Sequence, residues 1–306
     1  MIMKLTKICD GLGFPEGPIA MADGTVILVE IRRKTLSRVH TDGRIEVIAH
    51  LGGGPNGAAV GPDGMIYVCN NGGFVWTETD GITRPVGTPE DYLSGSIQRV
   101  DPATGTFETL YHSCEGQPLR GPNDIVFDAE GGFYFTDLGK ATSEYVHHGA
   151  FYYAKPDGSH IRRVHTPMIT PNGIGLSPDG KTVHVAETRT SRVWSYDLIA
   201  PGEIAAAPFT MPGRLTATLP DYQLLDSLAV QADGQICVAT LMRGGISVVP
   251  TDGGPVTFIE VPGDPYTTNI CFGGPDMCDA YITASGTGCL YHARWPTPGL
   301  KLNFNG

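Results

Sequence analysis

The sequence predicts an all-β fold, a six-bladed β-propeller, and two observations lead to this prediction. First, a pair of short apolar runs around a tight turn recurs along the chain, most clearly in residues 171–188, PNGIGLSPDGKTVHVAET. Proline and glycine stand where the turn of a β-hairpin requires them. Second, six such units recur at spacings of roughly 40 to 70 residues, which is typical of a radially repeated β fold. Their turns are centred on Asp23, Asp63, Glu130, Asp179, Asp233 and Asp276.

The six hairpins also share a polar position just ahead of their first strand. Seven residues before each turn residue stands a carboxylate or a carboxamide: Glu16, Asn56, Asn123, Asn172, Asp226 and Asn269. The innermost strand of each propeller blade runs along the central channel, so one register position in six blades forms a ring around the channel mouth. We therefore expect a ring of oxygen donors there.

Length and charge narrow the organisation and the partners. At about 50 residues per blade a six-bladed propeller uses the whole chain of 306 residues, so we expect one domain over residues 1–306. The net charge is -11, with 21 basic residues and no basic cluster. This composition argues against nucleic acid or an anionic membrane as a partner.

The cysteines and the first residues predict a cytoplasmic protein. The seven cysteines are odd in number, form no C-x-x-C pair and lie mostly in apolar runs, so we expect reduced thiols in the core. The start, MIMKLTKICDGLG, is too polar for a signal peptide, and no apolar run is long enough to span a bilayer. The oligomeric state stays open.

The predicted elements follow in order along the chain. Residues 3–8 form an outer strand that completes the last blade and closes the ring, and the first blade continues with strands at 25–30 and 36–48. The later blades open with Asn56, with RGPND (120–124), with the 171–188 hairpin, with LLDS (224–227) and with TTN (267–269). Residues 200–220 have no clear period and predict a surface excursion.

One long insertion interrupts the second blade. Residues 72–93 are rich in Gly, Thr, Pro and acids and include Trp76 and Tyr92. A loop of this length in a compact β domain is either functional or disordered. Its aromatic residues favour a lid over the channel that selects substrates. A second loop, 139–149, contains His147 and His148, whose adjacency on a polar segment is more typical of solvated side chains than of catalytic ones.

Several motifs resemble one known family. They are F-P-E-G-P at Glu16, P-N-D at Asn123, the P-N-G, S-P-D-G-K and V-A-E-T run of the fourth blade, and T-N-x-x-F-G-G at Asn269. The chain is similar to the family of gluconolactonase, senescence marker protein (regucalcin) and luciferin-regenerating enzyme. GGFYFTD (131–137) and the pair Asp226-Ser227 resemble its bacterial drug-responsive lactonase branch.

The resemblance implies a site as well as a fold. It implies one catalytic divalent metal ion held by Glu16, Asn172 and Asp226, and an asparagine, Asn123, that faces the substrate. Arg120 would also contact the substrate, but it lies three residues before Asn123, whereas sugar-lactonase members have their arginine two residues before. Asn56 and Asn269 complete the predicted substrate-binding set.

The donor types lead to the same chemistry. Carboxylates and amides without His or Cys suit a hard divalent ion, so we expect Ca²⁺ first, with Mg²⁺, Mn²⁺, Zn²⁺ or Fe²⁺ as alternatives. Such an ion polarises a carbonyl and acidifies a water, and lactone opening needs both effects. Asp226 would be both ligand and general base. The absence of G-x-S-x-G disfavours a covalent acyl-enzyme.

We therefore expect a metal-dependent lactonase that acts on a small molecule. Two alternatives remain at this stage. One is another hydrolysis on the same platform, of a phosphotriester or a strained ring. The other is a non-enzymatic calcium-binding or protein-interaction propeller, against which the ring of donors counts.

Overall fold

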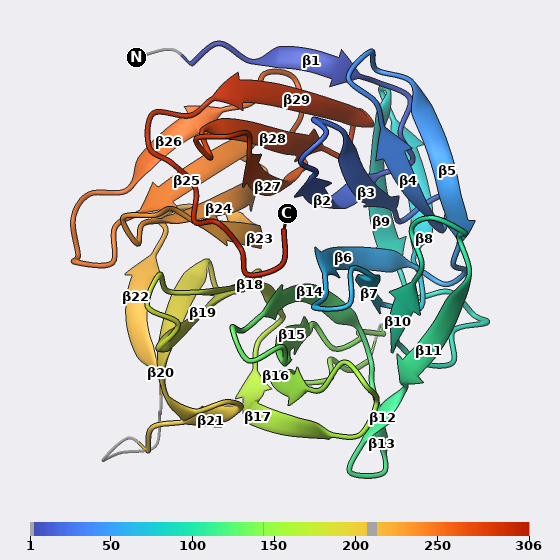
Figure 1. The fold of residues 1–306 in the computed structure, drawn as a ribbon, viewed down its shortest axis with the longest axis vertical. Helices are drawn as coiled ribbons and strands as arrows, with labels where there is room; N and C mark the ends of the chain where they lie inside the picture. The colour runs from blue at the N-terminus through green and yellow to red at the C-terminus, as the bar shows by residue number, and fades with distance from the viewer. Residues whose placement is uncertain (1–2, 143, 207–212, 306) are drawn as a thin grey trace.

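The computed structural model describes residues 3–142, 144–206 and 213–305, and within these ranges the regular structure is entirely β. Six sheets stand around a central axis (Figure 1). This confirms the predicted six-bladed β-propeller. None of the described residues forms a helix long and apolar enough to cross a membrane.

Each blade is an antiparallel sheet whose first strand lies innermost. Blades one to three are β2 (Pro15–Ala20), β3 (Val26–Glu30), β4 (Thr35–Val39) and β5 (Ile45–His50); β6 (Pro55–Val60), β7 (Ile66–Asn70), β10 (Ser96–Val100) and β11 (Phe107–Tyr111); and β14 (Pro122–Phe127), β15 (Phe133–Asp137), β16 (Gly149–Ala154) and β17 (Ile161–Met168). The six predicted hairpins are the first two strands of the six blades.

The second half of the ring repeats this arrangement. Blade four is β18 (Pro171–Leu176), β19 (Thr182–Glu187), β20 (Arg192–Ala200) and β22 (Arg214–Thr218), with β21 (Glu203–Ile204) beside β20; blade five is β23 (Leu224–Val230), β24 (Ile236–Leu241), β25 (Gly245–Val249) and β26 (Thr257–Glu260). Blade six is β27 (Thr267–Gly273), β28 (Asp279–Ala284), β29 (Cys289–Arg294) and the N-terminal β1 (Thr6–Cys9). Two small hairpins, β8 (Val75–Thr79) with β9 (Ile82–Gly87) and β12 (Ser113–Cys114) with β13 (Gln117–Pro118), lie outside the blades.

The apolar core is divided among the gaps between blades. One cluster between blades one and two contains Ile27, Leu36 and Ile66, and one between blades three and four contains Phe151 and Tyr196. Each of the six junctions has a cluster of this kind. Blades therefore stabilise one another sideways, and the inner strands are held at a constant level around the channel.

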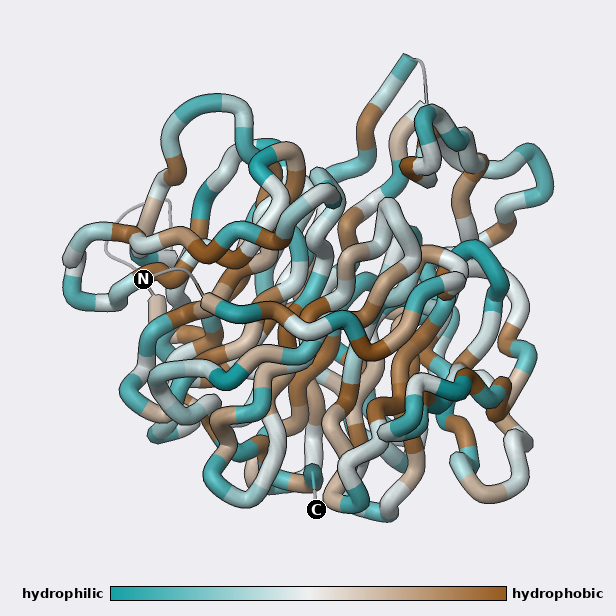
Figure 2. The backbone as a smooth tube through the Cα atoms, turned by 90° about the horizontal axis from the view of Figure 1, so that it is seen from above, coloured by the Kyte–Doolittle hydropathy of each residue, from teal (hydrophilic) through white to brown (hydrophobic). Residues whose placement is uncertain are grey.

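The C-terminal segment closes one end of the channel. The backbone N–H of Leu300 donates to the Val230 carbonyl at the last residue of β23, and the Phe304 ring lies 5.8 Å from that of Phe127 at the last residue of β14. Figure 2 places the C-terminus at one end of the ring axis. The opposite end, where the inner strands begin, is called the channel mouth below.

Candidate active site

A β-bulge near the start of every inner strand positions the ring residues at the mouth. The ladder between the first two strands of each blade is interrupted between Glu16 and Ile19, Pro55 and Ala58, Pro122 and Ile125, Pro171 and Ile174, Leu225 and Leu228, and Thr267 and Asn269. A bulge leaves a residue unpaired and redirects a side chain. The six predicted oxygen-donor residues lie in or beside these bulges, and all six are buried.

Glycines allow neighbouring inner strands to approach closely at this level. A Cβ atom on Gly17 would lie 2.7 Å from the Asn56 carbonyl oxygen, and one on Gly57 would lie 2.4 Å from the Asn123 carbonyl oxygen. A residue with a side chain does not fit such contacts. The backbones of adjacent blades therefore hold the ring residues beside one another.

Glu16 is oriented by two hydrogen bonds and lies near other carboxylates. Its Oε2 accepts a bond from the Asn269 amide at 2.7 Å and one from the Gly17 backbone N–H at 2.6 Å. Burial raises the pKa of Glu16 well above its usual value, and the charge of Asp226 raises it further. Asn269 therefore orients Glu16, in addition to any contact with substrate.

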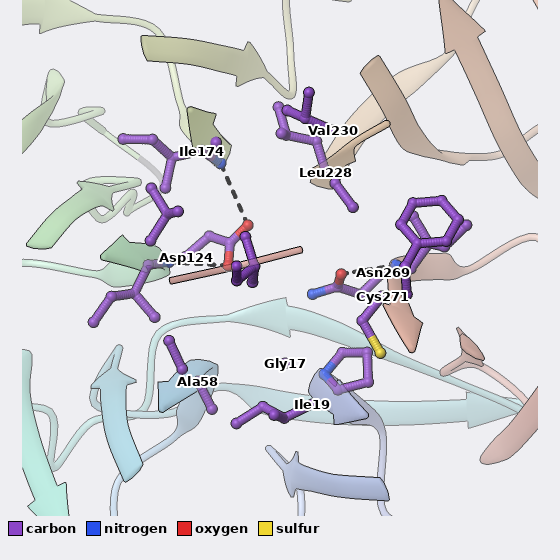
Figure 3. A pocket seen from close by; sticks show the side chains of 18 of the residues that line it. Gly17, Ile19, Ala58, Asp124, Ile174, Leu228, Val230, Asn269 and Cys271 are labelled. Carbon is purple, nitrogen blue, oxygen red and sulfur yellow. Dashed lines mark hydrogen bonds between the residues drawn. The ribbon is translucent and has the colours of Figure 1, made fainter. Parts of the chain in front are cut away.

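Asp226 and Asp124 are two further buried carboxyls close to Glu16. Burial raises the pKa of Asp226 to about 7, partly offset by the Asn172 amide, and it raises the pKa of Asp124 to about 7. Asp124 extends towards the neighbouring blade, where its Oδ2 accepts the Ile174 backbone N–H at 3.3 Å (Figure 3). No ion pair of the described residues involves Glu16, Asp124 or Asp226.

Two amide oxygens of the ring are buried without a hydrogen-bond donor, the Oδ1 atoms of Asn172 and Asn123. The Asn172 amide is oriented by its Nδ2, which donates to the Thr188 hydroxyl at 3.2 Å. A buried acceptor without a partner costs free energy. A cation or a substrate donor would provide the missing partner for each oxygen.

The remaining predicted residues border this group. Asn56 is buried at the ring position of blade two. Arg120 is half-buried in the segment before β14, where its backbone N–H donates to Asp137 Oδ2 at 2.7 Å and its carbonyl accepts the Tyr92 hydroxyl at 2.5 Å. Asp137 thus holds the loop that leads to Asn123.

Two polar residues of the site, Asp124 and Ser227, were not predicted. The Ser227 hydroxyl is also buried without a partner. The sequence does contain a signal for both: the position after the ring residue is glycine in blades one, two and four, but Asp124 in blade three and Ser227 in blade five. A polar side chain at a position that is otherwise glycine indicates a function beyond close packing.

The donor set fits a hard divalent cation. Glu16 and Asp226 offer carboxylate oxygens, and Asn172 offers an unpartnered amide oxygen, which are the ligand types that Ca²⁺, Mg²⁺ and Mn²⁺ prefer. Across the described ranges no group of three or more His, Cys, Asp or Glu has the arrangement of a metal site, so a site here depends on amide oxygens too. A cation would also offset the cost of burying several carboxylates together.

A serine and a histidine do pair elsewhere, in the interior of blade four. His184 Nδ1 lies 2.8 Å from Ser195 Oγ, and both residues are buried. Neither residue lines the channel cavity, and the Ser195 hydroxyl also contacts the Thr216 hydroxyl. This pair is a packing feature of the blade, which agrees with the expectation that no serine nucleophile operates.

The blade-two insertion 72–93 extends across the mouth from blade three to blades one and six. Thr88 donates to the Ala141 carbonyl of blade three at 3.2 Å, and the Thr83 backbone N–H donates to the Gly286 carbonyl of blade six at 2.8 Å. The Trp76 ring lies 4.9 Å from the ring of Phe14, two residues before Glu16. The predicted lid residue Trp76 therefore lies beside the loop that leads to Glu16, and Tyr92 lies beside Arg120.

A family profile described as SMP-30/Gluconolactonase/LRE-like region matches residues 14–286. The chain belongs to this family. The match covers every inner strand except the ends of the ring closure, so the six ring residues all fall within the family region.

Named relatives within or near the family include two lactonases. Lactonase drp35 of Staphylococcus saprophyticus is 28% identical over 252 residues, which cover 81% of this chain and 70% of the relative. The gluconolactonase of Zymomonas mobilis is 25% identical over 296 residues, which cover 87% and 75% of the two chains.

Solved structures agree in fold. A gluconolactonase from Xanthomonas campestris superposes with a TM-score of 0.75 at 24% identity, covering 97% of this chain and 90% of that one. A calcium-binding regucalcin from Agrobacterium tumefaciens gives a TM-score of 0.75 at 19% identity, covering 99% of each chain. At these identities the likeness establishes the propeller fold alone.

Proposed function

We propose that the protein hydrolyses lactones and that Glu16, Asn172 and Asp226 hold a divalent metal ion. The observation behind this proposal is the group of buried carboxylates, without an ion pair in the described residues, beside the unpartnered Asn172 oxygen at the channel mouth. The sequence similarity to lactonases over most of the chain supports the choice of substrate class.

The residues of the chain divide the catalytic work. A divalent ion bound there would polarise the ester carbonyl and make a water molecule more acidic. Asp226 removes a proton from the attacking water as its oxygen bonds to the carbonyl carbon. The bond between that carbon and the ring oxygen then breaks, and Asp226 returns the proton to the ring oxygen. The product is the open hydroxy acid.

Other ring residues bind and orient the substrate. The buried Oδ1 of Asn123 has no partner in the protein, so it can accept a hydrogen bond from a substrate hydroxyl. Asn56 and Arg120 border the same side of the mouth and complete the substrate contacts. Asn269 keeps Glu16 in place through its 2.7 Å hydrogen bond.

Ca²⁺ is the first candidate for the ion, with Mg²⁺, Mn²⁺, Zn²⁺ and Fe²⁺ as alternatives. The donor set is made of oxygen atoms, which Ca²⁺ accepts in flexible geometry. The structural similarity to a calcium-binding regucalcin supports this choice. We also propose a cytoplasmic location, because all seven cysteines are free thiols and five of them are buried.

The test combines metal analysis with a substrate panel. Protein stripped by a chelator is assayed on lactones of varied ring size and side chain and on an aryl phosphotriester, with each ion added back in turn. We expect one ion per chain and lactone turnover that depends on it. Glu16→Gln and Asn172→Ala should weaken ion affinity by at least about tenfold, whereas the exposed Glu108→Gln control should not.

Two results would overturn the proposal. One is full lactone turnover by protein that contains no metal. The other is turnover of the phosphotriester alone, with no lactone accepted under any ion.

A further inference from the structure

Lys140 is a buried lysine with no place in the proposed mechanism. Its side chain is 7% exposed. The ammonium nitrogen donates to the Gly73 carbonyl at 3.0 Å and lies 4.4 Å from the Phe74 ring centroid and 4.9 Å from that of Tyr92. All three partners belong to the blade-two insertion or its first residues, whereas Lys140 belongs to blade three.

The surroundings of Lys140 are those of a cation held between aromatic rings. An ammonium over an aromatic face is attracted by the ring quadrupole, and this attraction strengthens when water is excluded. Burial nonetheless disfavours the charged form and lowers the pKa of Lys140 to about 8. A methionine would fill the same volume without this cost, so the ammonium is not explained by packing alone.

The contacts of Lys140 lie next to the substrate-facing loops. A Cβ atom on Gly54, two residues before Asn56, would lie 2.7 Å from Gly73 Cα. On the other side, the Tyr92 hydroxyl donates to the Arg120 carbonyl, three residues before Asn123. The insertion is therefore attached at the two loops that lead to Asn56 and Asn123.

We propose that Lys140 is a positioning residue that holds the blade-two insertion as a fixed roof over one side of the channel mouth. The roof then limits the size of the ring substituent that can pass between the insertion and the ring residues. The part about substrate selection rests on the proposed lactonase function, whereas the part about the insertion does not.

The experiment compares three variants. Lys140→Met removes the cation and keeps the volume, and Lys140→Arg keeps a cation. Lys155→Met is a matched control, because Lys155 also lies over a tyrosine ring, 5.5 Å from the Tyr153 centroid, but at the other end of blade three. Hydrogen exchange of residues 72–93 is measured by mass spectrometry, together with kcat and KM on lactones with small and bulky substituents.

We expect Lys140→Met to speed exchange in residues 72–93 by about tenfold, as loss of a hydrogen bond to a charged group implies. Its melting temperature should stay within a few degrees of the wild type. The ratio of KM values for bulky and small lactones should shift by about tenfold with kcat within about twofold. Lys140→Arg should stay closer to the wild type, and Lys155→Met should match it.

The proposal is overturned if Lys140→Met leaves exchange in residues 72–93 unchanged, or if Lys155→Met has the same effect. Changed exchange with an unchanged substrate profile would overturn the selection part and leave the anchoring part. If the wild type turns over no lactone, the proposed function fails, while the exchange measurement still decides whether Lys140 anchors the insertion.

Discussion

Asp226 is the side chain on which turnover depends most in the proposed mechanism. Asp226→Asn keeps an oxygen donor and nearly the same volume, but it loses the ability to accept a proton from water. We expect kcat on the best lactone to fall by about 10²- to 10⁴-fold at saturating metal. Asn123→Ala should reduce kcat less, because that residue orients the substrate and transfers no proton.

Thermal melts separate this effect from misfolding. Burial raises the pKa of Asp226 to about 7, so its charged form is costly in the metal-free protein. The melting temperature of metal-free Asp226→Asn should therefore equal or exceed that of the wild type at neutral pH. A folded, metal-loaded Asp226→Asn protein with near wild-type kcat would rule out Asp226 as the base and make Glu16 the next candidate.

At the scale of elements, β19 and β20 of blade four bury the His184 and Ser195 pair. Burial between the strands lowers the pKa of His184 from 6.5 to about 4, with the charge of Arg214 adding to the effect. A histidine with a depressed folded pKa stays neutral where the unfolded chain already takes up a proton. Stability is therefore fully present above pH 6.5 and is lost as the pH falls towards 4.

The pH dependence of blade four follows from this shift. At 1.36 kcal/mol per pKa unit, His184 should account for a loss of roughly 3 kcal/mol of unfolding free energy between pH 6.5 and 4. His184→Gln, which can still accept a bond from Ser195, should remove most of that slope in urea melts at several pH values. The exposed His160→Gln should keep the wild-type slope. An unchanged slope in His184→Gln would contradict the assignment.

At the scale of the whole molecule, the ring is closed by a strand from the beginning of the chain. β1 pairs with β29, and Cys9 and Ile8 pack into the cluster of Leu28 and Leu290 between blades six and one. Deleting residues 1–9 should therefore cost roughly 3–5 kcal/mol, at about 1.5–3 kcal/mol for each buried apolar side chain. Deleting residues 1–4, which precede the strand, should cost little.

Urea melts of both truncations test the closure. The longer truncation should melt well below the wild type and the shorter one close to it. Equal stability of the two would show that β1 does not contribute to closing the ring. Because the metal ligands lie at the starts of the inner strands, partial opening should also weaken ion binding in the longer truncation.

The sequence by itself determined the fold class and the level of the site. Turn chemistry and strand period are local properties, so the six hairpins around Asp23, Asp63 and their counterparts could be found without a structure. The seven-residue offset from each turn then identified Glu16, Asn172 and Asp226 as equivalent positions, because a repeated unit places equivalent residues at one height.

Only the tertiary structure decided which of these groups meet and which groups join them. Asn269 donates to Glu16 although 253 residues separate them, and Asp124 reaches Ile174 of the next blade. Lys140 lies against Gly73 and Tyr92 of an insertion that belongs to another blade. Each contact depends on how segments remote in the chain pack side by side, and a local pattern of residues contains no information on that packing.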